Sequence, residues 1–205
     1  MEPEGDLRRR ILLCTHPALR RKAATVKRMD RKLQRTLDEM VEIMLAAPGL
    51  GLAAPQIGEP IRCCVLVTPE ESTRRLVNPR IVKRQGRVVA PEGCLSLPTL
   101  QGMVPRARKI QVKALDENMK PDVFEAEGLY ARAIQHELNH LDGVLFMDRA
   151  QEGSLAWQVP DEQEEDGVRL EPTSEEEVLE VFARLAKERE KGGERSLASG
   201  LLRDA

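Results

Sequence analysis

Long apolar runs are absent from this 205-residue sequence, in which no stretch approaches the roughly 20 apolar residues that a membrane-spanning helix needs. Residues 1–10 are charged and no apolar segment follows them, so they do not resemble a secretory signal. An excess of one charge is also missing, because the net charge is -2 and the pI is near 6.0. This balance gives no overall attraction to nucleic acid or anionic membranes, although it allows local patches. We expect a soluble cytoplasmic protein that makes no membrane contact and does not bind nucleic acid in a sequence-specific way.

Cysteine is scarce, and three of the four cysteines resemble buried apolar residues. Cys63 and Cys64 are adjacent in a strand-like run, where neighbouring side chains point to opposite faces and are poorly placed for a disulfide. Cys14 is expected in or near the core. Cys94 differs from the other three, because glycine and proline flank it on both sides. Cys94 is therefore less typical of a buried apolar cysteine than the other three.

The order of apolar patterns predicts an α+β fold of one domain with a tail. Asp30 is a suitable N-cap for an amphipathic helix that stops at Pro48-Gly49. The apolar stripe of that helix consists of Leu33, Leu37, Met40, Val41, Met44 and Leu45. Residues 61–68, 76–83, 109–115 and 123–127 predict strands of a mostly antiparallel sheet, whereas residues 11–29 predict an irregular arm. We assign residues 1–150 to a single domain in which antiparallel sheets surround a central helix.

A C-terminal extension follows, and its composition differs from that of the domain. Residues 151–173 are acidic with few apolar side chains, which predicts a flexible linker. Thr173 or Ser174 with Glu176 or Glu177 forms a capping box for a helical tail over residues 174–205. The apolar face of this helix consists of Val178, Leu179, Phe182 and Leu185. Packing against the domain and binding of a partner are both compatible with such a face.

Residues 136–140 form an H-E-x-x-H motif in a chain with only three histidines. Apolar residues recur at helical intervals between residues 128 and 143, so His136 and His140 share one helical face and can bind one metal ion. Glu137 is then beside that ion, where it can take a proton from an activated water molecule. The alternative is a solvated helix that carries two surface histidines.

A tetrahedral metal site needs at least one more protein ligand, and His16, Cys94 and many carboxylates are candidates. Cys94 stands in a turn-like segment, residues 91–98, where a thiolate can protrude toward an ion. Sulfur beside two imidazoles suits iron, zinc, nickel or cobalt rather than magnesium. Taken alone, Cys94 is also compatible with an ordinary buried cysteine.

Residues 49–58 contain glycines that superficially match the dinucleotide-binding pattern G-x-G-x-x-A. That pattern must follow a strand and open a helix, whereas this segment follows a helix, and Pro55 and Gly58 argue against a long helix after it. A glycine-rich loop that approaches a ligand closely and presents Gln56 as an amide donor is the better interpretation.

These three segments, in this order, resemble the peptide deformylase family. The first is similar to the family's GxGxAAxQ motif, the second to EGCxS, and the third, residues 135–140, to QHExDH. The resemblance covers most of residues 11–149 and includes Val104-Pro105-Arg106 and residues 143–148. Such enzymes remove the formyl group from the initiator formyl-methionine of newly made polypeptides and release formate.

The resemblance implies a role for each matching residue. Cys94, His136 and His140 would hold the metal, which is Fe2+ in many members, with zinc, nickel or cobalt as substitutes. Glu137 would act as general base and then acid, and the Gln56 amide and Leu95 backbone N–H would help to hold the oxyanion. The expected substrate-binding positions are Leu50, Leu129 and Ala133 for the methionine side chain, Gly51, and Arg106 for the substrate backbone. The partners implied are nascent formyl-methionyl peptides and the ribosome near its exit tunnel.

Two departures from the family pattern stand out. Asn139 replaces the usual aspartate, which removes a negative charge beside the site and predicts tuning rather than loss of activity. The acidic tail would repel ribosomal RNA, so its role is left unassigned.

A zinc peptidase would need a downstream histidine or glutamate ligand, and no histidine follows His140. A non-catalytic relative is the third alternative, and the complete set of ligands, base and Gln56 argues against it.

Overall fold

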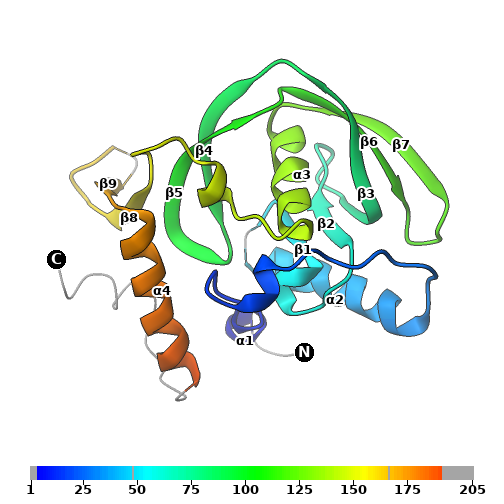
Figure 1. Cartoon of the computed structure of the whole chain (residues 1–205), viewed down its shortest axis with the longest axis horizontal. Helices are drawn as coiled ribbons and strands as arrows, with labels where there is room; N and C mark the ends of the chain where they lie inside the picture. The colour runs from blue at the N-terminus through cyan, green and yellow to red at the C-terminus, as the bar shows by residue number, and fades with distance from the viewer. Residues whose placement is uncertain (1–3, 48, 166, 191–205) are drawn as a thin grey trace.

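The computed structural model describes residues 4–190, apart from residues 48 and 166, and contains two antiparallel sheets. One sheet has the order β1 (Gly51–Ala53), β2 (Cys63–Val67), β3 (Thr73–Gln85), β6 (Lys109–Leu115) and β7 (Pro121–Glu127). The other has the order β4 (Val88–Cys94), β5 (Leu97–Arg106), β8 (Ala156–Pro160) and β9 (Val168–Pro172). Figure 1 shows α3 (Gly128–Leu141) between the two sheets, so the predicted α+β fold around a central helix is confirmed.

The predicted N-terminal amphipathic helix is α2 (Arg31–Ala46), and its start is confirmed at the cap. The Leu33 N–H donates to the Asp30 side chain at 2.8 Å. One member of the predicted apolar stripe is wrong, because Leu45 is 58% exposed whereas Ile43 is buried. Each residue advances about 100° around a helix, which turns Leu45 away from the face that carries Met40, Ile43 and Met44.

Four predicted strands appear as β2, β3, β6 and β7, whereas the hairpin of β4 and β5 was not predicted. Pro91, Gly93 and Pro105 give this hairpin the composition of turns. Proline is tolerated here for a positional reason: β4 is an edge strand, and Pro105 in β5 lies beyond the segment that pairs with β8. Because of this composition, the two strands that position Cys94 were not predicted.

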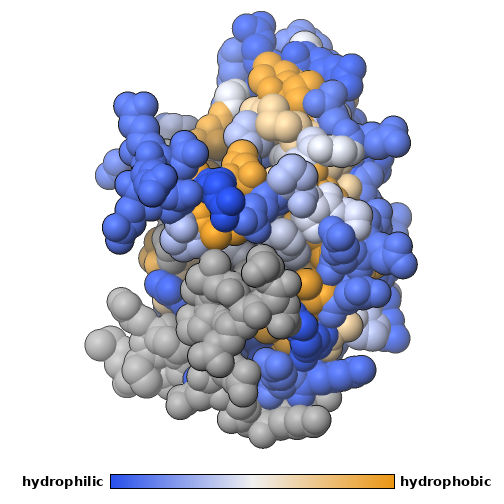
Figure 2. All heavy atoms as spheres, turned by 90° about the vertical axis from the view of Figure 1, so that its left-hand side faces the viewer, coloured by the Kyte–Doolittle hydropathy of each residue, from blue (hydrophilic) through white to orange (hydrophobic). Residues whose placement is uncertain are grey.

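The prediction of a flexible linker over residues 151–173 is wrong, because these residues contain the β8–β9 hairpin. The hairpin joins the second sheet through pairing of β8 with β5, in which Trp157 lies opposite Leu100. Figure 2 shows many hydrophilic side chains on this side of the molecule, interrupted by smaller apolar patches. Only a few inward side chains of the hairpin, such as Ala156, are buried. One face of an antiparallel sheet can be exposed to solvent, and the many acidic residues of this segment gave the hairpin the composition of a linker.

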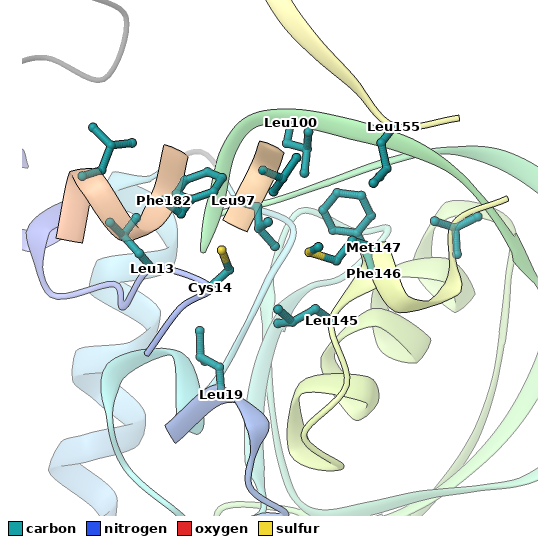
Figure 3. Packing of buried hydrophobic residues seen from close by; sticks show 13 residues of the cluster. Leu13, Cys14, Leu19, Leu97, Leu100, Leu145, Phe146, Met147, Leu155 and Phe182 are labelled. Atoms are coloured by element: carbon teal, nitrogen blue, oxygen red, sulfur yellow. The ribbon is translucent and has the colours of Figure 1, made fainter. Parts of the chain in front are cut away.

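The C-terminal helix α4 (Glu175–Glu190) packs back on the domain. Its predicted capping box is confirmed, because the Glu177 N–H donates to Ser174 Oγ at 3.2 Å and the Ser174 N–H donates to the Glu177 carboxylate at 3.0 Å. The buried face of α4 joins a cluster that includes Leu97 and Leu100 of β5 (Figure 3). Val178, Phe182 and Leu185 form that face. The predicted helical tail extends to residue 205, and residues 191–205 lie outside the described residues.

The N-terminal segment contains one helix that was not predicted, α1 (Glu4–Arg9), and then the predicted irregular arm with a single 3-10 turn, η1 (Pro17–Arg20). Cys14 of this arm is buried beside Leu13 and Leu97 (Figure 3). Burial raises the pKa of the Cys14 and Cys63 thiols to about 12, and it raises the pKa of Cys64 as well. The three free, buried thiols confirm the prediction from sequence. In the described part of the chain, no helix is long and apolar enough to cross a membrane.

Candidate metal centre and active-site cavity

Helix α3 places two imidazoles one turn apart at the centre of the molecule. His136 Nε2 and His140 Nε2 lie 3.2 Å apart, and Cys94 Sγ at the end of β4 lies 3.2 Å from His140 Nε2. The three atoms all lie within 4.8 Å of one another. His16 is elsewhere, because its Nδ1 accepts from the Ala18 N–H at 3.2 Å and caps η1. Of His16 and Cys94, which the sequence left open as ligands beside many carboxylates, the structure brings only Cys94 to the histidines.

The donor set fits a divalent transition metal. Two nitrogens bound to one tetrahedral ion at about 2.0 Å would be about 3.3 Å apart, close to the separation of the two imidazoles. One thiolate and two imidazoles match the ligand preference of iron, zinc, nickel or cobalt, and three protein ligands leave one coordination position for a reactant. Gly143 lies just after the end of α3 and has a φ of 75°, a conformation that favours glycine. A Cβ at this position would also lie 2.8 Å from the Arg20 carbonyl oxygen.

Glu137 lies beside the three ligands and is 3% exposed. Its Oε2 is buried and has no hydrogen-bond partner among the described residues. Burial raises the pKa of Glu137 to about 7, so this carboxyl can bind or release a proton near neutral pH. A buried oxygen of this kind requires a partner, which a water molecule or substrate can supply.

Gly51 in β1 leaves the space that the Glu137 side chain occupies. A Cβ at position 51 would lie 2.5 Å from Glu137 Oε1 and 2.8 Å from its Cγ. Side-chain atoms do not approach so closely, so any larger residue would displace the carboxylate. Gly51 was predicted only as a substrate-binding position, and its contact with Glu137 is a function that the sequence did not indicate.

The buried carboxylate of Glu92 contacts His136 on Nδ1, the ring nitrogen that does not face His140. His136 Nδ1 lies 3.2 Å from Glu92 Oε2, and the other contacts of Glu92 are a two-pronged pair with Arg106, at 2.9 and 2.8 Å, and a hydrogen bond from Arg132 at 2.7 Å. Burial opposes ionisation, but hydrogen bonds from Arg106 and His136 outweigh it and lower the pKa of Glu92 to about 2. A carboxylate on the outer nitrogen of a ligating histidine fixes its tautomer and ring orientation.

Sequence reasoning missed this network, although one signal was present. Glu92 stands two residues before Cys94, and Arg132 stands one helical turn before His136 on the same face. A buried anion next to a metal helix requires cations, and two arginines supply them. The missing information was the distance between β4 and α3, which no local pattern contains.

The predicted contact of Arg106 with the substrate backbone does not fit the structure. Arg106 is 7% exposed and does not line the cavity onto which Cys94, His136 and Glu137 open. Its guanidinium is occupied by Glu92 and also donates to Asn139 Oδ1 on α3. Asn139 therefore contacts Arg106, which is paired with Glu92. This contact agrees with the expectation that Asn139 supports the site without binding the metal.

Gln56 is fixed by the loop that follows β1. The Ala53 N–H donates to Gln56 Oε1 at 2.8 Å, and Gln56 Nε2 donates to Ser96 Oγ at 3.2 Å and lies 3.7 Å from Cys94 Sγ. These contacts place the donor end of the amide beside the metal ligands. The dinucleotide interpretation was correctly rejected, because β1 pairs antiparallel with β2 and only a 3-10 turn, η2 (Ala54–Ile57), follows it.

A cavity of about 550 Å3 opens onto these groups. It is lined by the predicted positions Leu50, Gly51, Gln56, Cys94, Leu95, Leu129, Ala133, His136 and Glu137. Leu50 and Leu129 are 48% and 64% exposed, and large apolar side chains exposed at a cavity are typical of a binding site. Other lining residues were not predicted, and among them are three polar side chains from segments far from the three motifs: Arg8, Gln158 and Arg189.

Comparison with known proteins places this arrangement in a family. A family model described as polypeptide deformylase matches residues 8–155. The peptide deformylase of Natranaerobius thermophilus is 49% identical over 137 residues, which cover 66% of this chain and 88% of that protein. Peptide deformylase 1 of Bacillus subtilis is 46% identical over 138 residues, which cover 66% of this chain and 86% of that protein.

Solved structures agree with the sequence matches. The crystal structure of peptide deformylase from Thermus thermophilus has 45% identity and a TM-score of 0.67, covering 69% of this chain and 85% of that chain. The peptide deformylase from Synechococcus elongatus in complex with actinonin has 38% identity and a TM-score of 0.67, covering 69% of this chain and 80% of that chain. Residues beyond 155, including the whole β8–β9 hairpin and all of α4, lie outside the family match.

Proposed function

This chain belongs to the polypeptide deformylase family and removes the N-formyl group from newly made polypeptides, and we propose that Glu137 and its neighbours catalyse this hydrolysis with Fe2+. The observation that carries the proposal is the convergence of Cys94, His136 and His140 beside the unpartnered Oε2 of Glu137. Water adds to the formyl carbon, the C–N bond breaks, and formate and a free amino terminus are released. A zinc peptidase is disfavoured, because the third donor is an upstream cysteine rather than a downstream histidine or glutamate.

The metal would be held by Cys94, His136 and His140. When bound, it supplies a Lewis acid that polarises the formyl oxygen and lowers the pKa of water. The donor set supports iron, zinc, nickel or cobalt, and the choice of Fe2+ rests on the resemblance to the family. Glu92 keeps His136 oriented for ligation through the hydrogen bond to Nδ1.

Glu137 is proposed to move the proton. Its carboxylate takes a proton from the attacking water at Oε2 and then donates it to the departing nitrogen. A pKa near 7 suits both steps, since the group must accept and release the proton at the same pH. The buried position of Glu137 keeps bulk water away from this transfer.

Gln56 and Leu95 are proposed to hold the oxygen that becomes negatively charged. The contacts of Gln56 with Ala53 and Ser96 fix its amide before the substrate arrives, so little reorganisation is needed in the transition state. The Leu95 backbone N–H, next to Cys94, is the second proposed donor. Leu50, Leu129 and Ala133 are proposed to accommodate the methionine side chain, because they supply apolar surface on the wall of the cavity.

Release of formate from a formyl-Met-Ala-Ser peptide by anaerobically purified protein tests this function. We expect turnover with the formylated peptide and no cleavage of its peptide bonds. Glu137→Gln should keep the metal and lose about 10²- to 10⁴-fold in kcat. Cys94→Ala should lose the metal by elemental analysis. Wild-type kcat in Glu137→Gln would refute the proposed proton transfer, and cleavage of unformylated peptides would revive the peptidase alternative.

We also propose that the enzyme works in the cytoplasm and meets nascent chains at the ribosome near the exit tunnel. A second groove, of about 680 Å3, supports this proposal. Its lining includes Arg80, Arg84, Arg87 and Arg149, which have no carboxylate partner among the described residues. Guanidinium groups suit RNA phosphates, and such a patch gives local attraction although the chain has a net charge of -2.

Co-sedimentation with ribosomes tests this partner. We expect binding that weakens steeply with salt and falls further when Arg84 and Arg87 are both changed to glutamine. Lys113→Gln, on β6 and outside the groove, is the matched control and should bind as the wild type does. Equal binding by all three proteins would contradict a role for the groove.

A further inference from the structure

The two ends of the described chain meet at the active-site cavity. Arg8 of α1 and Arg189 of α4 both line it, together with Gln158 of β8. Gln158 and Arg189 belong to the part of the chain that lies outside the family match. Packing of α4 on the core fixes Arg189 at this place, because Phe182 is 1% exposed and its ring centroid lies 5.9 Å from that of Trp157.

Each of the two arginines is held by a backbone carbonyl. Arg189 Nη1 donates to the Ile11 carbonyl oxygen at 3.2 Å, and Arg8 Nε donates to the Ala46 carbonyl oxygen at 2.6 Å. Neither guanidinium forms an ion pair with a carboxylate in the described part of the chain. A carbonyl occupies only part of the five N–H donors of an arginine, so each guanidinium retains donors for a ligand.

Among the described residues that line the cavity, no acidic side chain outside the catalytic set is left to balance the charge of Arg8 and Arg189. The other charged lining groups outside the catalytic set, Glu92 and Arg132, are paired with each other deep in the wall. An excess of positive charge on one wall of a cavity attracts an anion.

We infer that Arg8 and Arg189 form a subsite for a carboxylate of the substrate, so that the enzyme prefers peptides with an acidic residue downstream of formyl-methionine. The inference rests on the proposed function, because formyl-methionine must lie in the same cavity beside Glu137. Guanidinium forks match carboxylate geometry, and the Gln158 amide can add a further hydrogen bond. The C-terminal extension thereby acts as a specificity element of the active site.

Peptides of the form formyl-Met-Ala-Xaa-Ser-amide test the inference, with the acidic residue also moved one and two positions downstream. The amidated end leaves the side chain as the sole carboxylate. At the favoured position we expect kcat/KM to be about three- to tenfold higher for Glu than for Gln, mainly through KM, and lowest for Lys. The preference should shrink as salt is raised from about 50 mM to about 500 mM.

Variants of Arg8 and Arg189 test whether these two side chains cause the preference for the Glu peptide. Arg189→Gln and Arg8→Gln should bring the Glu-to-Gln ratio toward one, and Arg189→Glu should shift the preference toward Lys. Lys187→Gln is the matched control, because it removes one charge from the same helix without touching the cavity, and its ratio should equal that of the wild type.

Three results would overturn the inference. Formate released equally fast from the Glu, Gln and Lys peptides at every position would eliminate the subsite and leave the deformylase function intact. A ratio lowered as much by Lys187→Gln as by Arg189→Gln would show a general effect of net charge. No formate from any peptide would overturn the proposed catalytic roles and the subsite with them.

Discussion

Replacement of Gly51 by alanine should separate turnover from metal binding. The added Cβ would lie 2.5 Å from Glu137 Oε1, and an ordinary contact of about 3.5 Å requires the carboxylate to move by about 1 Å. A displacement of this size in a reacting group costs about 10²-fold in rate. The three heavy atoms nearest to that Cβ all belong to Glu137, so the main displacement should fall on this carboxylate and metal content should stay at the wild-type level.

The assay combines kcat for formate release, elemental analysis and thermal unfolding of Gly51→Ala. The double variant Gly51→Ala with Glu137→Gln provides the control for mechanism. If alanine acts only by displacing Glu137, it should cost little further activity once Glu137 has been replaced. A Gly51→Ala enzyme with wild-type kcat, or one that loses its metal as well, would refute the reasoning from this contact.

Three further predictions concern the thiols, the buried anion and the C-terminal helix. After removal of metal by a chelator, alkylation of the folded protein should modify Cys94 and spare the three buried cysteines; modification of all four at equal rates would contradict their burial. Glu92→Gln should lower the free energy of unfolding by about 3 kcal/mol and metal affinity by about 10- to 100-fold, as measured by urea unfolding and metal titration; unchanged values would contradict its structural role. Phe182→Ala should cost about 3 kcal/mol in the same unfolding experiment, whereas no change would mean that α4 is not part of the core.

Local patterns predicted the parts of the fold whose signal is contained in one segment. The spacing of His136 and His140 predicted their common helical face, and the cap at Asp30 predicted the start of α2, because both depend on residues only a few positions apart. Alternating apolar runs predicted β6 with the bounds that the structure has. The family resemblance added Cys94, whose position next to the histidines depends on the fold.

Features that depend on distant segments were not predicted. Proline and glycine in β4 and β5 and acidic residues in the β8–β9 hairpin resemble loops, and only pairing between strands shows that they belong to a sheet. Arg106 was assigned to the substrate because the sequence could not show that Glu92 binds it. Arg189 reaches the cavity through the packing of α4 on the core, and no local pattern around Arg189 indicates where that helix docks.

X-ray absorption spectroscopy at the metal edge of the anaerobically purified enzyme identifies the atoms that bind the ion. We propose that one thiolate and two imidazoles on β4 and α3 bind a single catalytic ion. We predict one sulfur and two imidazole nitrogens in the first coordination shell, with the sulfur contribution lost in Cys94→Ser. A shell without sulfur, or one that Cys94→Ser leaves unchanged, would contradict this set of ligands.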